Sequence, residues 1–291
     1  MPTATATATA AATATAPVLT GRAGEAVAAL GPRVRFRDLY DEVGSAVYHD
    51  LAGRDTHEVR ELLARLRTRS GPVLELAAGT GRLTMPMLSL GREVTALELS
   101  GSMLDLLRER LEAGPPALRQ RCVLVRGDMS SFALGRRFGA VVLGTTSVSL
   151  LDAAGRVGLY RAVRAHLAPG GRFLLSTVDA AGPAGHESAG HEPAADSAAE
   201  VALNYTAASG RGYRMFEQWS PGARTRTVVV LPEPLPDSGP VDVCTTEIGV
   251  LSADLLTEEL VAAGFTAPRR HALPDAGVRH RDVLLETGVA P

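Results

Sequence analysis

Short apolar runs, separated by glycine- or proline-bearing breaks, fill the middle of the chain, and each has the length of a buried strand in a parallel sheet. These runs cover residues 73–76, 94–99, 122–129, 138–144 and 172–178. Between them, apolar residues recur at the three- and four-residue spacing of helices, over 56–69, 83–90, 101–111 and 156–167. The alternation of the two patterns predicts an α/β domain with helices on both faces of a sheet.

The pattern changes after residue 200. Runs rich in valine, threonine and aromatic residues cover 213–219, 224–231 and 241–250, and a turn over 220–223 separates the first two. Such runs predict antiparallel strands. A helix over 257–263, closed by a glycine, and a last strand over 282–286 then return to the α/β pattern. The antiparallel sheet is therefore expected to interrupt the α/β domain.

The N-terminal residues have a different composition. Residues 1–20 alternate alanine and threonine and cannot bury a core, which predicts a disordered tail. They lack the basic and apolar regions of a signal peptide. Residues 25–30 predict a short helical piece, and 33–37 a basic, solvated connector.

Two glycines and two acids give the first indication of chemistry. Gly79 and Gly81 follow the first strand and allow a tight turn that approaches a ligand without Cβ clashes. Glu98 ends the second strand, 17 residues beyond Gly81, a spacing at which an acid accepts hydrogen bonds from a ribose diol. Asp128 ends the third strand, directly after Gly127. Together they predict an adenosine-containing ligand across the carboxyl ends of neighbouring strands.

Composition removes several alternatives. The net charge of −2 over 291 residues indicates neither nucleic acid nor an anionic membrane as a partner, and no apolar run reaches the length of a membrane span. All 30 basic residues are arginine, which excludes lysine-based sites such as a pyridoxal Schiff base or a P-loop. Cys122 and Cys244 indicate reduced thiols in a cytoplasmic protein. His186 and His191 lie in a loose segment that indicates a mobile loop, so no metal is expected.

These motifs resemble those of class I S-adenosylmethionine-dependent methyltransferases. The matching stretches are residues 75–81, Glu98, 127–128 and 167–175. The resemblance implies a Rossmann-like seven-stranded sheet with helices on both faces, and an inserted antiparallel β cover between the fifth and sixth strands. A nicotinamide dinucleotide fits less well, because Thr84 occupies the third glycine position of its fingerprint. The residues that the resemblance assigns to S-adenosylmethionine are Tyr40, Glu75, Ala77, Gly79, Gly81, Arg82, Glu98, Leu99, Met103, Gly127, Asp128, Met129 and Gly144.

The resemblance also indicates where a methyl acceptor binds. The end of the fourth strand faces the transferred methyl group, which assigns Thr145 and Thr146 to the acceptor. Tyr205, Tyr213 and Trp219 of the inserted sheet either line a pocket for an amine-bearing substrate or pack the insert's own core. An amine must be neutral to attack a methyl carbon, so a residue has to remove its proton or orient it. The candidates for this role are Tyr48, His49 and Glu217.

The segment before the first strand is open to two interpretations. Tyr40, Val43, Val47 and Leu51 fall at helical spacings, which predicts an amphipathic helix that packs on the domain. In related methyltransferases a helical segment at this place closes over the cofactor as a lid. The predicted division of the chain is a tail (1–20), an N-terminal helical lid region (21–70), a cofactor-binding core (71–179), a mobile loop with the antiparallel insert (180–250) and a C-terminal completion of the core (251–291).

At finer grain, residues 39–48, 75–84 and 127–132 are similar to the methyltransferases of daptide-type ribosomal peptide clusters. Those enzymes are thought to dimethylate the new amine at a remodelled peptide C-terminus, which implies a peptide amine as substrate. The alternatives are another natural product, such as an amino sugar or a phenol, and a cofactor-binding homologue without catalysis. A homodimer is left open.

Overall fold

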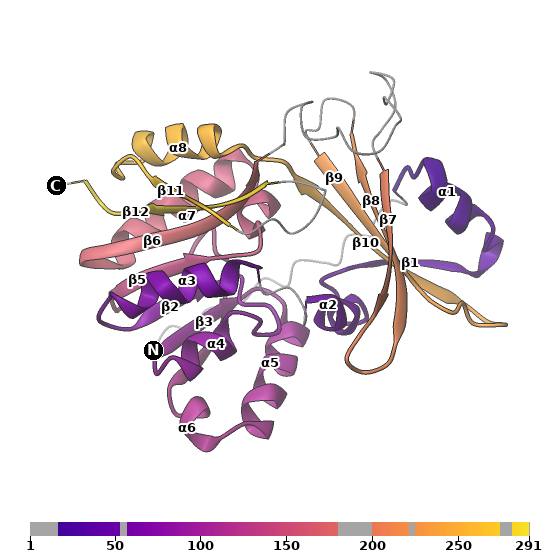
Figure 1. Ribbon diagram of the computed structural model, residues 1–291, viewed down its shortest axis with the longest axis horizontal. Helices are drawn as coiled ribbons and strands as arrows, with labels where there is room; N and C mark the ends of the chain where they lie inside the picture. The colour runs from indigo at the N-terminus through magenta and orange to yellow at the C-terminus, as the bar shows by residue number, and fades with distance from the viewer. Residues whose placement is uncertain (1–16, 53–56, 180–199, 221–224, 274–280, 291) are drawn as a thin grey trace, which may run out of the picture.

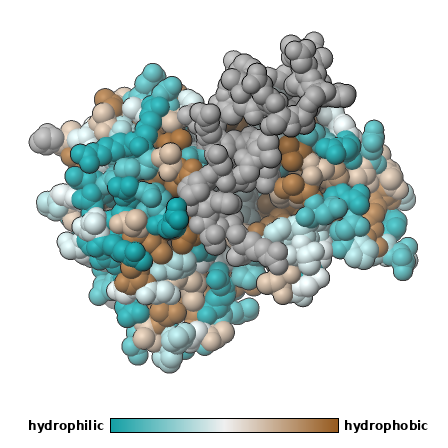
Figure 2. All heavy atoms as spheres, in the orientation of Figure 1, coloured by the Kyte–Doolittle hydropathy of each residue, from teal (hydrophilic) through white to brown (hydrophobic). Residues whose placement is uncertain are grey.

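The computed structural model describes residues 17–52, 57–179, 200–220, 225–273 and 281–290. These residues form two bodies side by side, an α/β body and an antiparallel sheet (Figure 1). Hydrophilic and hydrophobic residues are interspersed over the visible surface of both (Figure 2). No helix of the described residues is long and apolar enough to cross a membrane. Most of the predicted N-terminal tail and the predicted loop with His186 and His191 lie outside the described residues.

The α/β body holds the predicted seven-stranded sheet, in the order β11-β12-β6-β5-β2-β3-β4. Its parallel strands are β2 (Val73–Leu76), β3 (Val94–Glu98), β4 (Cys122–Arg126), β5 (Phe138–Leu143) and β6 (Leu167–Asp179). The strand β12 (Arg281–Thr287) lies beside β6 and runs antiparallel to it, and the edge strand β11 (Arg269–Ala272) pairs antiparallel with β12 and so runs in the direction of the parallel strands. The sequence analysis missed β11, because its run Arg-Arg-His-Ala carries no apolar alternation.

Helices cover both faces of this sheet. Buried leucines of α7 (Ala153–His166) and α8 (Ala253–Ala262) pack on one face, and those of α3 (His57–Arg67), α4 (Thr84–Ser89) and α5 (Gly101–Ala113) on the other, beside the short α6 (Pro116–Arg119). Ser100 caps α5 as predicted, since its hydroxyl accepts the Met103 N–H. Ser252 caps α8 in the same way, so α8 begins four residues before the predicted helix.

The second body is the cover sheet, with strand order β1-β10-β9-β8-β7. The strands β7 (Glu200–Thr206), β8 (Gly212–Trp219), β9 (Thr225–Pro232) and β10 (Val241–Gly249) are antiparallel neighbours, and β1 (Val34–Asp38) runs parallel to β10. The helix α1 (Gly21–Ala28) packs on the outer face of this sheet and continues through the 3₁₀ turn η1 (Gly31–Arg33) into β1.

The N-terminal region therefore differs from the prediction of a helical region over 21–70. Residues 33–37 are mostly strand and not a solvated connector, because Val34 and Phe36 alternate toward the apolar layer under α1. Arg37 on the opposite side is paired, with its Nε 2.8 Å from Asp242 Oδ1 of β10. The first 22 described residues thus belong to the cover sheet, although they precede the whole α/β body in sequence.

The helix α2 (Gly44–Ala52) lies between the two bodies (Figure 1). It is shorter than the predicted helix over 39–51, since Asp41 accepts the N–H groups of Val43 and Gly44 and holds the preceding residues in a turn. Near its other end, the buried Asp50 carboxylate accepts hydrogen bonds from Tyr213 Oη (2.6 Å) and Ser209 Oγ (3.1 Å). These bonds attach α2 to the β7–β8 hairpin.

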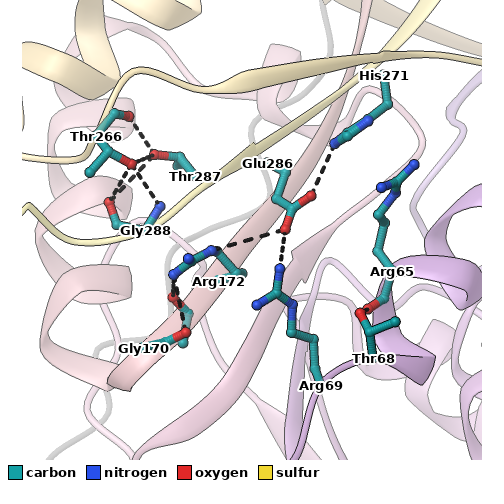
Figure 3. A network of polar contacts seen from close by, with 11 residues as sticks. Arg65, Thr68, Arg69, Gly170, Arg172, Thr266, His271, Glu286, Thr287 and Gly288 are labelled. Atoms are coloured by element: carbon teal, nitrogen blue, oxygen red, sulfur yellow. Dashed lines mark hydrogen bonds and ion pairs between the residues drawn. The ribbon is translucent and has the colours of Figure 1, made fainter.

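A polar network joins β11 and β12 to the rest of the α/β body at the amino ends of β2 and β6 (Figure 3). Glu286 of β12 is buried and lies 2.7 Å from Arg69 Nη2, 3.0 Å from His271 Nε2 and 4.0 Å from Arg172 Nε. Burial raises the pKa of the Glu286 carboxyl, but His271 and Arg69 outweigh it and hold that pKa below its ordinary value. The ionised carboxylate fixes β11, β12 and the end of α3 at the edge opposite the carboxyl ends of the strands.

Candidate functional site

A cavity of about 840 Å³ lies where the carboxyl ends of the parallel strands meet the inner face of the cover sheet. One wall comes from the loops that follow β2, β3, β4 and β5, and the facing wall from β7, β8, β9 and β10. The segment that leads into α2, and α2 itself, close a third side. The position agrees with the rule that open α/β sheets bind ligands beyond the carboxyl ends of their strands.

The turn after β2 has the predicted tight backbone. Ala77, Gly79 and Gly81 have φ values of 50°, 54° and 87°, in the left-handed region. Ala77 and Gly79 line the cavity, whereas Gly81 does not. A Cβ at Gly81 would lie 2.3 Å from Leu107 Cδ1, so this glycine lets the turn pack against α5.

The acid at the end of β3 is held rigidly. Glu98 Oε2 accepts the Gly79 N–H at 2.8 Å, and Glu98 Oε1 accepts the Ser100 N–H at 2.9 Å. The carboxylate lines the cavity, and its remaining lone pairs are placed to accept hydroxyl groups of a ligand. The sequence predicts an acid for ligand hydroxyls at this place, and the two backbone bonds explain how the carboxylate is oriented.

The neighbouring wall is apolar with one acid at its rim. Leu99 is 63% exposed although it is a large apolar residue, and it faces the cavity beside the buried Met103 and Met129. Asp128, after Gly127, also lines the cavity and accepts the Ser130 N–H at 2.7 Å. An exposed leucine beside a carboxylate suits a flat heterocycle that needs both contact and a hydrogen bond.

Besides Gly81, two more residues assigned to the cofactor lie behind the cavity wall. Glu75 is buried and accepts a hydrogen bond from Thr84 Oγ1, and burial raises its pKa to about 8. Gly144 does not line the cavity either. A Cβ there would lie 2.3 Å from Leu83 Cδ1 and 2.9 Å from Glu58 Oε1, so Gly144 makes room for the neighbouring groups.

The structure adds one residue that sequence analysis missed. Glu58, in the first turn of α3, lines the cavity, and its carboxylate pairs with the Arg82 guanidinium. It also accepts the N–H of Thr145, at 2.9 Å from Oε1 and 3.1 Å from Oε2. Thr145 and Thr146 line the cavity as predicted and lead into the 3₁₀ turn η2 (Ser147–Leu150). An acid in a first helical turn is common at helix surfaces, so the sequence carried no signal for this contact.

Two of the three polar residues singled out near α2 reach the cavity. The rings of Tyr40 and Tyr48 line it, with centroids 5.7 Å apart. The Tyr40 carbonyl accepts a hydrogen bond from Ser100 Oγ at 3.0 Å, which attaches this segment to the start of α5. His49 does not line the cavity, and burial together with the Arg110 guanidinium lowers its pKa. His49 therefore lacks the position that a base acting on the acceptor needs.

The cover sheet supplies the facing wall. Glu217 is 6% exposed and lines the cavity, with its Oε2 3.7 Å from Arg226 Nη1. Tyr205 also lines it, and its hydroxyl donates to the Asp50 carbonyl at 2.9 Å. Trp219 was assigned to the substrate pocket but does not line the cavity; it is the last residue of β8, two positions beyond Glu217.

The charge of the walls indicates the kind of ligand that fits. The described lining residues carry seven carboxylates and three guanidinium groups, a formal net charge of −4, and this favours a cation over an anion. The left-handed turn, the oriented Glu98 and the exposed Leu99 fit the adenosine and amino-acid parts of a sulfonium cofactor. The lining acids are Asp41, Glu42, Glu58, Glu98, Asp128, Glu217 and Asp282, and the lining bases are Arg82, Arg126 and Arg226.

Comparison with known proteins gives consistent relatives. Residues 73–171 match the family model described as a methyltransferase domain. Over 159 residues, 51% of this chain and 56% of the relative, the chain is 36% identical to dTDP-3-amino-3,6-dideoxy-alpha-D-glucopyranose N,N-dimethyltransferase from Streptomyces fradiae. It is 32% identical to dTDP-3-amino-3,4,6-trideoxy-alpha-D-glucopyranose N,N-dimethyltransferase from Streptomyces venezuelae, over 49% of this chain and 56% of that protein. The matches thus span little more than half the length of these curated relatives.

Among solved structures, the glycopeptide N-methyltransferase MtfA complexed with (S)-adenosyl-L-methionine is similar over nearly the whole chain. The alignment has a TM-score of 0.62 and 38% identity, and it covers 94% of this chain and 100% of that one. The same protein complexed with (S)-adenosyl-L-homocysteine aligns with a TM-score of 0.64 and 41% identity. The similarity therefore includes the cover sheet as well as the α/β body.

Proposed function

Since this chain belongs to the class I S-adenosylmethionine-dependent methyltransferases, we propose that it transfers a methyl group from that cofactor to the amine of a natural product. The observation that carries the proposal is the acidic cavity, with Glu98 and Asp128 on its sheet side and Glu217 on its cover side. The acids on the sheet side suit the cofactor, and the buried acid opposite suits an amine. The three relatives described above are N-methyltransferases by name.

In this proposal the residues of the α/β body hold the cofactor. Glu98 accepts the ribose hydroxyls, Asp128 lies beside adenine, and the left-handed turn at Ala77 and Gly79 approaches the methionine part. The cofactor supplies an electrophilic methyl group on a sulfonium, and the protein aligns the amine with it and excludes water. Tyr40 covers this part of the site from the side of α2.

The acceptor side must provide a neutral amine. Glu217 is the carboxylate best placed to orient an incoming ammonium and to take its proton, because it is buried on the cover-side wall of the cavity that Thr145 and Thr146 also line. The amine lone pair then forms the new N–C bond while the S–CH₃ bond breaks and its electron pair stays on sulfur. The second proton of the methylated ammonium leaves to solvent or to Glu217 before another methyl is added. Tyr48, which also lines the cavity, is the second candidate for this role.

We propose a peptide amine, dimethylated at nitrogen, as the acceptor, in line with the similarity to daptide-type enzymes. The cavity wall on the cover side is largely apolar, with Leu203, Met215, Val228 and Ile248 around Glu217. A nucleoside diphosphate sugar brings two negative charges, and two of the three lining arginines are poorly suited to them, since Arg82 pairs with Glu58 and Arg226 faces Glu217. The third, Arg126, donates to the Leu99 carbonyl at 3.3 Å. A dTDP-linked amino sugar is the second candidate because two relatives use such substrates.

A competition experiment separates the two acceptors. The purified protein and S-adenosylmethionine are incubated with an equimolar mixture of an N-terminally acetylated, lysine-free peptide ending in an aliphatic amine, the same acetylated peptide ending in a carboxylate, and a dTDP-3-amino sugar, and the products are read by mass spectrometry. We expect mono- and dimethylation of the amine-ending peptide alone. Methylation confined to the nucleotide sugar would show that the acceptor is the amino sugar and not the peptide. Methylation of the carboxylate-ending peptide would contradict selectivity for the C-terminal amine.

A further inference from the structure

The carboxylate of Glu58 joins two parts of the cavity that are far apart in sequence. It pairs with Arg82, which follows the glycine turn on the cofactor side, and the two side chains are 7% and 8% exposed. It also accepts the Thr145 N–H with both oxygens, and Thr145 Oγ1 lies 3.2 Å from Oε1. The Thr145 hydroxyl in turn accepts a hydrogen bond from Arg82. The three residues form a closed set of bonds at the cavity wall.

The backbone at this place has an unfavourable conformation. Thr145 and Thr146 both have φ of 57°, in the left-handed region that β-branched residues rarely adopt. Together with Ala77 they are the non-glycine residues with positive φ in the described part of the chain, and all three line the cavity. Strained backbone of this kind persists only where surrounding contacts hold it, and it is concentrated at functional sites.

Glu58 is suited to hold this backbone. Burial raises the pKa of its carboxyl, but Arg82, the Ser176 side chain and the Thr145 N–H outweigh burial and keep the pKa below its ordinary value. The group is therefore an anion at neutral pH, and its hydrogen bonds are of the stronger, charge-assisted kind. Gly144 leaves the space for it, since a Cβ there would lie 2.9 Å from Glu58 Oε1.

We propose that Glu58 is a positioning residue for methyl transfer: it holds the turn at 145–146 in its left-handed conformation on the acceptor side and orients Arg82 on the cofactor side. The residue couples the two halves of the reaction geometry without touching the reacting atoms. The inference rests on the proposed function for its effect on turnover. Its effect on the backbone is independent of that function.

The first test therefore uses the protein without ligands. Hydrogen exchange of the Thr145 amide is compared in the unaltered protein, in Glu58→Ala and in the matched control Glu61→Ala. Glu61 lies on the same helix and pairs with Arg65 away from the cavity. Loss of a hydrogen bond to a charged group should speed exchange at Thr145 about tenfold to a hundredfold in Glu58→Ala, and leave it unchanged in the control. Unchanged exchange in Glu58→Ala would overturn the proposal.

The second test asks whether Glu58 acts through the turn. Turnover is measured in Glu58→Ala, Thr145→Gly and the double variant, with the melting temperature of each. Glycine adopts the left-handed conformation without the steric penalty, so the loss caused by Glu58→Ala should be about fivefold to thirtyfold smaller in the Thr145→Gly background. Equal losses in both backgrounds would overturn the proposal, because Glu58 would then act on turnover independently of the turn at 145–146.

Two provisions keep the test decisive. If Glu58→Ala does not fold, Glu58→Gln takes its place in both experiments, since it keeps the size of the side chain and one acceptor oxygen. If no acceptor is methylated, the same two single variants and the double variant are compared by their affinity for S-adenosylhomocysteine, measured by calorimetry. Faster exchange with a non-additive loss of affinity would then support the role of Glu58 although the proposed reaction had failed.

Discussion

Replacing Glu98 by glutamine tests the cofactor site most specifically. The Glu98 carboxylate accepts one backbone N–H on each oxygen, from Gly79 and from Ser100, and it lines the cavity with its remaining lone pairs. An amide has one oxygen, so Glu98→Gln turns an NH₂ group toward one of these donors and offers the ligand a weaker, neutral acceptor. The change alters charge and hydrogen bonding while the volume stays nearly constant.

The magnitude follows from these contacts. A hydrogen bond between a ribose hydroxyl and a carboxylate contributes roughly 1.5–3 kcal/mol, so the dissociation constant for S-adenosylmethionine should rise about tenfold to a hundredfold. Within the protein, one backbone bond is weakened at a cost of about 1 kcal/mol, which lowers the melting temperature by about 2–4 °C for a domain of this size. Affinity should thus fall far more than stability.

Titration calorimetry with S-adenosylmethionine and with S-adenosylhomocysteine measures the affinities, and scanning calorimetry measures the melting temperatures. Glu93→Gln is the matched control, because Glu93 precedes the same strand, is 69% exposed and lies away from the cavity. The control should bind both ligands normally. A folded Glu98→Gln protein with unchanged affinity for S-adenosylmethionine would refute the reasoning. Glu98 would then only hold the turn after β2 in place and would not bind the cofactor.

Three further predictions concern the neighbouring groups. Tyr40→Phe should lower turnover about tenfold or more through misplacement of reacting groups, with little change in melting temperature, and full activity in a steady-state assay would contradict its role over the cofactor. Asp50→Asn should speed hydrogen exchange across 44–52 by weakening the bonds to Tyr213 and Ser209, a prediction that fails if that segment exchanges as before. Burial raises the pKa of Glu75 to about 8, so the folded state holds a proton that the unfolded state loses, and stability should fall as pH rises from about 4.5 to about 8. In Glu75→Gln, chemical denaturation at several pH values should show a flatter dependence, and an identical slope would exclude Glu75 as the cause.

The fold was predictable where local pattern and burial agree. The strands over 73–76, 94–98 and 138–143 are mostly apolar and almost completely buried, and glycine or proline lies near their ends, so the α/β arrangement followed from their sequence. Positions such as Glu98 and Asp128 were placed correctly at the cavity because the carboxyl ends of parallel strands meet at one edge.

The features that the sequence did not predict depend on contacts between segments that are distant in the chain. The strand β1 looked like a polar connector because its apolar residues face α1, and only pairing with β10, some 200 residues later, makes it a strand. Glu58 gave no signal for the same reason, since its partner Thr145 is 87 residues away. His49 and Trp219 were assigned to the site by residue type, but which side chains of α2 and β8 reach the cavity depends on how these elements pack, and neither residue lines it.

The central claim is that this protein moves a methyl group from S-adenosylmethionine to an amine nitrogen. The most direct measurement supplies the cofactor with an isotopically labelled methyl group, adds the amine-ending peptide, and locates the label in the product by magnetic resonance and mass spectrometry. The account predicts one and then two labelled methyl groups on nitrogen, with one S-adenosylhomocysteine released for each. Label on oxygen, or tight binding of the cofactor with neither labelled product nor S-adenosylhomocysteine, would contradict it.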